Sequence, residues 1–233
     1  MGRQIQGLLY FFINDIRYSL IIFWTILLSV LIVSLAFAYF LITVENGVMA
    51  FSLTGPIYIY CAIFGFLTVK EAVPFSLKMG ATRKNLFISL GIFFLALSFA
   101  KAVVGSILQE IIEGFAVGVG ISTFSFLHLA YFTTDTWYTR ILIDTSIIFF
   151  FLAFMFMIGL LFYKYGIAGG GIVLGILVIA LLVGIAKGWV FDFFTKLLVT
   201  FNLGFFFQLL AVGILIYAVS YVFLKRITVV KVK

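Results

Sequence analysis

Charged residues are scarce in this chain. Lys, Arg, Asp and Glu account for 10% of the 233 residues, and hydrophobic residues account for 65%. A soluble globular domain carries roughly a quarter charged residues, so this chain has too few polar side chains to cover a soluble core of its size. The mean hydropathy of +1.33 therefore predicts a single transmembrane domain over residues 1–233, with lipid as its solvent.

Histidine and cysteine are almost absent, with His128 and Cys61 as the single examples. A zinc site of the usual type draws several ligands from these two residue types, and one cysteine cannot form an internal disulfide. The glycines at 169–171 lie inside a hydrophobic run and lack the lysine and hydroxyl of a phosphate-binding loop. We therefore expect no catalytic residue, no metal and no enzyme activity in this chain by itself.

Long uncharged runs, in contrast, recur at lengths that suit a bilayer. A helix needs about 20 apolar residues to cross about 30 Å of hydrocarbon, and it satisfies its own backbone hydrogen bonds in lipid. The third run is long enough only if Lys101 extends its amino group toward the membrane surface. The predicted fold is an all-α membrane protein with six transmembrane helices, at roughly 18–43, 55–70, 85–108, 142–163, 166–187 and 202–224.

The uncharged stretch 114–134 is an alternative seventh span. It is rich in glycine, serine and threonine, and a seventh crossing would reverse the side on which Lys164 and the C-terminus lie. We favour six spans and interpret 109–141 as an outer-face segment.

Lysine and arginine are distributed unevenly between the predicted loops, and such residues concentrate on the cytoplasmic side of membrane proteins. With the N-terminus inside, the outer side holds only Arg140, Lys187 and Lys196, with Lys101 near it. Both termini, including a tail at 225–233, are therefore expected in the cytoplasm. The basic residues on that side are Arg3, Arg17, Lys70, Lys78, Arg83, Lys84, Lys164, Lys225, Arg226, Lys231 and Lys233.

The N-terminal residues 1–17 have an amphipathic pattern. Leu8, Phe12 and Ile16 share one helical face, whereas Arg3 and Arg17 lie on the other. This pattern predicts an interfacial helix, either a simple surface anchor or an elbow that orients the first span.

A second short helix is predicted between spans two and three. Pro74 suits a first helical turn, Gly80 suits the left-handed position after a helix end, and Thr82 can cap the third span. An ordinary loop remains the alternative, although Phe75, Leu77 and Met79 give the segment an apolar character. Together with its basic residues, this composition favours a docking surface.

Few other features carry a functional signal. Lys101 and Gln208 are the polar residues that could line a substrate path, although for Lys101 an extended, surface-seeking side chain is the preferred interpretation. The aromatic segment 188–196 is expected to dip into the outer leaflet, with one long tilted helix as the alternative. Small-residue spacings allow close helix contacts at Gly166/Gly170, Gly171/Gly175, Ala180/Gly184/Gly188 and Gly114/Gly118.

The order of these parts resembles the ABC-2-type permeases, which are membrane subunits of bacterial ABC exporters that work with a separate ATPase. The most specific local similarity is the stretch Val73-Pro-Phe-Ser-Leu-Lys-Met-Gly-Ala-Thr-Arg-Lys-Asn-Leu-Phe87. The resemblance implies a location in the bacterial cell membrane and a coupling helix that contacts the ATPase. The coupling residues would be Pro74, Phe75, Leu77, Lys78, Met79, Gly80, Arg83 and Lys84.

The same resemblance implies the partners. ATP and Mg would bind to the ATP-binding-cassette subunit rather than to this chain, and a second permease subunit, the same or different, would complete the path. No nucleic acid is expected as a partner. The expected substrate is hydrophobic or amphipathic, such as a peptide, an antimicrobial or a lipid. The alternative function is a non-transporting membrane sensor or immunity protein that binds such a ligand.

Overall fold

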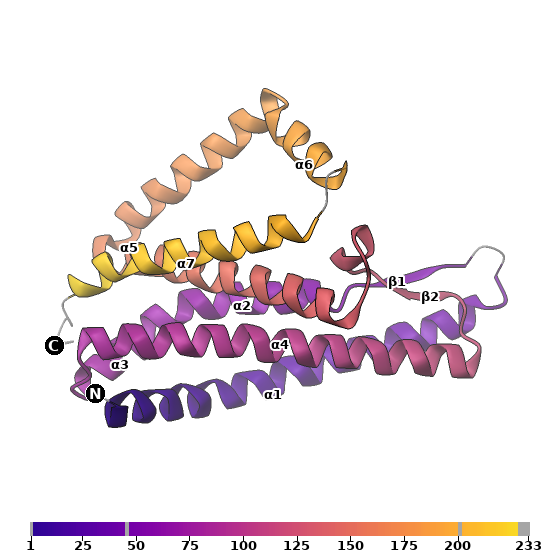
Figure 1. Ribbon diagram of the computed structural model, residues 1–233, viewed down its shortest axis with the longest axis horizontal. Coiled ribbons are helices and arrows are strands. Elements are labelled where there is room, and N and C mark those ends of the chain that lie inside the picture. Colours follow the sequence, from indigo (N-terminus) through magenta and orange to yellow (C-terminus); the bar gives the residue numbers. More distant parts are fainter. Residues whose placement is uncertain (1, 45–46, 200–201, 228–233) are drawn as a thin grey trace.

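The computed structural model describes residues 2–44, 47–199 and 202–227 and is almost entirely helical (Figure 1). Two three-residue strands, β1 (Met49–Phe51) and β2 (Phe124–Phe126), pair in parallel, and a short 3₁₀ helix, η1 (Leu129–Phe132), follows them. The α-helices are α1 (Gly2–Leu41), α2 (Thr54–Lys70), α3 (Ala72–Lys78), α4 (Arg83–Val119), α5 (Trp137–Ala186), α6 (Trp189–Val199) and α7 (Leu203–Lys225).

Several of these helices have the properties of membrane spans. Within the described residues, five helical stretches are long and apolar enough to cross a bilayer. They are Gly2–Leu41, Thr54–Lys78, Arg83–Val119, Trp137–Ala186 and Leu203–Lys225. An all-helical chain with this many long apolar helices is compatible with a multi-pass membrane protein, as the composition predicts.

Helix α5 is interrupted at Gly166, where φ is 70° and ψ is −171°. At this combination of φ and ψ a Cβ atom would clash with the backbone, so the break depends on glycine. Figure 1 shows that the chain reverses there: the second part of α5 leads away from the bundle to α6, and α7 returns. The break lies between the two spans expected at 142–163 and 166–187.

The core forms where α2, α4, the first part of α5 and α7 pack together. Its centre is aromatic: the Tyr217 ring packs against those of Phe87, Phe94 and Phe156 at centroid distances of 4.5, 5.9 and 5.9 Å. The Tyr217 hydroxyl donates a 2.5 Å hydrogen bond to the Phe87 carbonyl oxygen, so α7 is tied to α4. Cys61 is fully buried here.

The separate interfacial helix expected at 1–17 is not seen. Residues 2–41 form one helix because no proline or backbone break interrupts them. Leu8, Phe12 and Ile16 are buried and continue into the core cluster that also contains Leu27 and Leu31. The apolar face that resembled a membrane-surface helix is therefore a packing face within the protein.

The predicted outer-face segment 109–141 is only partly irregular. Helix α4 continues to Val119, beyond the expected end at 108, and ends with Gly120 in the left-handed conformation. The rest of 114–134 contains β2 and η1 rather than a single helix, so the alternative seventh helix does not form there. The Thr123 hydroxyl donates to the Ala38 carbonyl oxygen at 2.6 Å and joins this segment to α1.

The segment 188–196 also turns rather than extending one long helix. Gly188 has a φ of 79°, and α6 runs back from Trp189 toward α7 (Figure 1). The alternative of a single long tilted helix is therefore wrong, because α6 and α7 are separate helices; the dip of 188–196 into the outer leaflet stays a prediction.

Most of the basic residues that the structure describes lie at one end of the molecule. The end that carries α3 also holds the start of α1 and the end of α7 (Figure 1), and we call it the basic end. Its basic residues include Arg3, Lys70, Lys78, Arg83, Lys84, Lys164, Lys225 and Arg226. The opposite end, which carries the β1–β2 sheet, holds the acidic residues Glu110, Glu113 and Asp135.

Candidate functional site at the basic end

Helix α3 has defined boundaries. It covers Ala72–Lys78, two residues earlier than the helix predicted from Pro74 to Gly80, and Pro74 still lies in its first turn. At its end the Gly80 amide donates to the Leu77 carbonyl oxygen, and the Ala81 amide donates to the Ser76 carbonyl oxygen. This pattern, with Gly80 at a φ of 87°, is a Schellman motif.

The start of α4 follows immediately. The Thr82 side chain accepts a hydrogen bond from the Asn85 amide at 3.3 Å, so Thr82 is the N-cap predicted for this helix. Only Ala81 lies between Gly80, which follows α3, and Thr82, which caps α4. This short connection limits how far α3 can move relative to α4.

Helix α1 holds α3 from the side. The rings of Phe11 and Phe75 stack with a centroid distance of 4.8 Å, and the Gln4 amide group donates to the Gly80 carbonyl oxygen at 3.1 Å. The Asn85 side chain donates to the Gln4 side-chain oxygen. The N-terminal turns of α1 thus bridge the end of α3 and the start of α4.

The last described residues complete this assembly. The Arg83 guanidinium donates to the Ile227 carbonyl oxygen at 2.7 Å, and Ile227 is buried. Parts of the chain that are distant in sequence, α1 and the segment after α7, therefore meet next to α3 and the start of α4.

The predicted coupling residues divide between an inner and an outer side of α3. Leu77 and Pro74 are half-buried, whereas Phe75 and Met79 expose 45% and 56% of their surface. The remaining members, Lys78, Gly80, Arg83 and Lys84, are exposed. The structure thus brings these residues together as one apolar and basic surface, with Leu77 turned toward the core.

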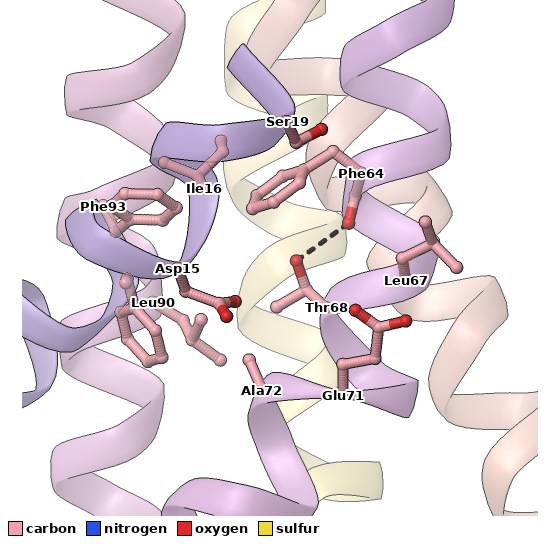
Figure 2. Close-up of a pocket in the computed structure, with 11 residues that line it drawn as sticks. Asp15, Ile16, Ser19, Phe64, Leu67, Thr68, Glu71, Ala72, Leu90 and Phe93 are labelled. Atoms are coloured by element: carbon pink, nitrogen blue, oxygen red, sulfur yellow. Dashed lines mark hydrogen bonds between the residues drawn. The ribbon is translucent and has the colours of Figure 1, made fainter. Parts of the chain in front are cut away.

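A small cavity of about 110 Å³ lies beside α3, between α1, α2 and α4. Figure 2 shows Asp15 of α1 and Glu71, which joins α2 to α3, on either side of Thr68. Ser19 also lines the cavity. The two carboxylates place a local negative charge next to the basic surface, a combination that suits contact with a partner carrying both signs of charge.

Lys101 lies away from this end and is enclosed. Its side chain was expected to extend to the membrane surface, which is wrong: the residue is 3% exposed. Its Nζ atom has no hydrogen-bond partner and lies over three aromatic rings of α1 and α2. Lys101 is buried because of its position on α4. It shares one buried face of this helix with Leu90, Phe94 and Leu97, at spacings of three and four residues.

Gln208, the other residue expected along a substrate path, is exposed on α7. Lys101 is buried among α1, α2 and α4, so the structure does not bring these two side chains to one surface. A path that uses both residues has no direct geometric support.

The sheet end contains two polar clusters that the sequence did not indicate. In the first, Arg140 forms a bidentate pair with Asp135 at 2.6 Å for both contacts and also contacts Glu110 and Glu113 at 3.3 and 3.6 Å. The Tyr131 hydroxyl donates to Glu113 at 3.1 Å. Burial, together with the charge of Glu113, raises the pKa of Tyr131 to about 12, so its hydroxyl keeps its proton at neutral pH.

The second cluster is buried. The Tyr58 hydroxyl donates to Asp144 at 2.5 Å, and His128 Nε2 lies 3.2 Å from the same carboxylate oxygen. Because His128 Nδ1 accepts the Ala130 amide hydrogen, Nε2 carries the proton in the neutral ring and donates to Asp144. Tyr58 and Asp144 are 86 positions apart, and no local spacing could have paired them.

Searches with known proteins identify no relative. The chain matches no family model, no curated protein and no solved structure.

Proposed function

We propose that this chain is the permease subunit of an ATP-driven exporter of the ABC-2 type, and that α3 is its coupling helix. The observation that carries the proposal is the exposed apolar and basic surface of α3 and the start of α4. Contacts with α1 and Ile227 hold this surface in place, and an interface whose parts are already ordered loses less conformational entropy when it binds. The partner ATPase binds ATP and Mg²⁺ and performs the hydrolysis.

In this proposal the chain crosses the bacterial cell membrane six times, with the basic end in the cytoplasm. The crossings are α1, α2, α4, the two parts of α5 and α7. Support comes from the concentration of lysine and arginine at the basic end and from the break at Gly166, which divides a 50-residue helix. Helix α1, with 40 residues, is about 60 Å long. It therefore extends beyond about 30 Å of hydrocarbon and reaches α3 in the cytoplasm.

A second permease subunit, the same or different, completes the transport path. ATP binding by the partner shifts the pair between conformations, and transport requires that the substrate bind these conformations with different affinity. The apolar surroundings of the spans favour a hydrophobic or amphipathic substrate.

The test is copurification from the native cells, with mass spectrometry to identify an ATP-binding-cassette ATPase that is retained with this chain. Phe75→Ala and Met79→Glu remove apolar contacts from α3, and Arg83→Glu reverses a charge. We expect each to reduce the copurified ATPase by about tenfold or more, as for central interface residues. Leu127→Ala is the matched control, because Leu127 is an exposed hydrophobic residue (61%) near the sheet end.

Retained monodispersity and an unchanged melting temperature of each variant separate a lost interface from a lost fold. If the unaltered chain forms no complex with the ATPase, or if the α3 variants bind it as well as Leu127→Ala does, the permease proposal fails. The non-transporting ligand-binding protein is then the better interpretation.

A further inference from the structure

The amino group of Lys101 lies inside a cage of aromatic rings. Its Nζ atom is 4.0 Å from the ring centroid of Phe23, 4.7 Å from that of Trp24 and 4.4 Å from that of Tyr60. Phe23 and Trp24 belong to α1 and Tyr60 belongs to α2, so the rings approach the amino group from two helices. Within the described residues, Nζ has neither a hydrogen-bond acceptor nor a carboxylate partner within salt-bridge distance.

This arrangement is chemically selective. Ring faces attract a cation within about 6 Å of the centroid, and the attraction strengthens when water is excluded. A primary ammonium also needs acceptors for its three N–H groups, which the cage does not supply. A quaternary alkylammonium has no N–H group to satisfy, so it fits this cage better than the lysine that now occupies it.

An apolar groove of about 600 Å³ runs between α1 and α4 near the cage. Its lining includes Leu20 and Ile21, which precede Phe23 and Trp24 on α1, and Ala100, which precedes Lys101 on α4. Phe23 and Trp24 are themselves only partly buried. The groove therefore offers an alkyl chain a place beside the cage, along α1 and α4.

We propose that the cage of Phe23, Trp24 and Tyr60 binds the head of an amphiphilic alkylammonium ion, whose alkyl chain lies in the α1–α4 groove. Lys101 is the internal occupant that this ligand displaces. As a statement about the transported substrate, the inference rests on the proposed function. Binding itself is a property of this chain alone and is measured without an ATPase.

The experiment measures equilibrium binding of radiolabelled hexyltrimethylammonium to the purified full chain by scintillation proximity. A maltoside detergent is used, because phosphatidylcholine carries a competing trimethylammonium group. Lys101→Ala empties the cage, and Lys101→Arg keeps a cation in it. In the Lys101→Ala background, Tyr60→Leu removes a ring, whereas Tyr60→Phe keeps the ring and removes only the hydroxyl.

We expect Lys101→Ala to bind the probe about tenfold more tightly than the unaltered chain, and Lys101→Arg to bind like the unaltered chain. Tyr60→Leu should cancel the gain, a loss of about tenfold, and Tyr60→Phe should preserve it. Melting temperatures report whether each variant folds; if Tyr60→Leu does not, Trp24→Leu serves for the same comparison.

Equal affinity of the Lys101→Ala and unaltered chains would overturn the proposal, as would equal affinity of the Tyr60→Leu and Tyr60→Phe variants or undetectable binding by all of them. These outcomes differ from a failure of the proposed function, which appears as a missing complex with the ATPase. Cage binding without such a complex would leave the site intact and assign it to a ligand-binding protein that does not transport.

Discussion

His128, Asp144 and Tyr58 show how buried polar side chains are accommodated in this bundle. His128 and Asp144 are 4% and 2% exposed, and a carboxylate in such a place is costly unless donors surround it. Tyr58 and His128 supply two donors, and the Ala130 amide fixes the orientation of the histidine ring. The cluster thereby joins α2, the start of α5 and the segment before η1.

Replacing His128 by alanine should destabilise the protein. The change leaves the Asp144 carboxylate with one donor fewer in a buried place, and losing a hydrogen bond to a charged group costs about 1.5–3 kcal/mol. The measurement is the melting temperature of the purified protein in detergent. Thr25→Ala is the control, because the exposed Thr25 hydroxyl bonds only within its own helix, to the Ile21 carbonyl oxygen, and no more than about 0.5 kcal/mol is expected there. A His128→Ala protein that melts like the control would show that the cluster contributes nothing to stability.

At the level of helices, α2 and the first part of α5 pack closely against each other. A Cβ atom on Gly65 would lie 2.6 Å from the Leu152 carbonyl oxygen, and one on Gly159 would lie 2.9 Å from Val69 Cγ2. Of the glycines in the spacings that the sequence indicated, Gly184 meets α6, because a Cβ there would lie 2.4 Å from Trp189 Cζ2, and a Cβ on Gly170 would lie 2.4 Å from Phe162 Cγ. A Cβ on Gly114, Gly118, Gly171 or Gly175 would meet nothing within 4 Å. Spacing alone therefore identified some of the closely packed glycines and missed Gly65 and Gly159, because which glycine meets a neighbouring helix depends on how the helices are placed.

Gly65→Ala should force α2 and α5 apart, because the atom in its way belongs to backbone that cannot rotate aside. Overpacking of this kind costs about 1–3 kcal/mol, and we expect a lower melting temperature and a lower yield of monodisperse protein. The matched control is Gly114→Ala in α4, which has open space and should be neutral or stabilising by up to about 1 kcal/mol, since alanine favours helix. Equal melting temperatures for the two variants would contradict the close α2–α5 contact.

For the whole molecule, the distribution of charge and the reversal at Gly166 predict a specific labelling pattern. The native thiol of Cys61 is buried and is replaced by alanine. Single cysteines are then introduced at the exposed positions Lys78, Lys225, Ser122 and Lys187. A membrane-impermeant maleimide added to intact cells should label positions 122 and 187, and should reach 78 and 225 only after permeabilisation.

Position 187 decides the number of crossings. Labelling there from outside requires that the second part of α5 cross the membrane, which gives six crossings. If 187 reacts only in permeabilised cells, that helix returns without crossing and the six-span topology is wrong. Labelling of 78 from outside would instead reverse the orientation and remove α3 from the cytoplasm.

Much of this protein was decided by local sequence. Composition predicted a membrane protein, with which the long apolar helices are compatible, and uncharged runs located these helices to within a few residues at many of their ends. The stop of α3 and the start of α4 followed from Gly80 and Thr82, and Pro74 gave the start of α3 to within two residues, since backbone conformation and capping depend on immediate neighbours. Tertiary structure decided what the pattern of polarity could not. It made residues 2–41 one packed helix, and it placed Lys101 inside an aromatic cage instead of at the surface. It also joined His128 and Tyr58 to Asp144, because contacts between distant helices depend on how the helices pack and leave no local trace in the chain.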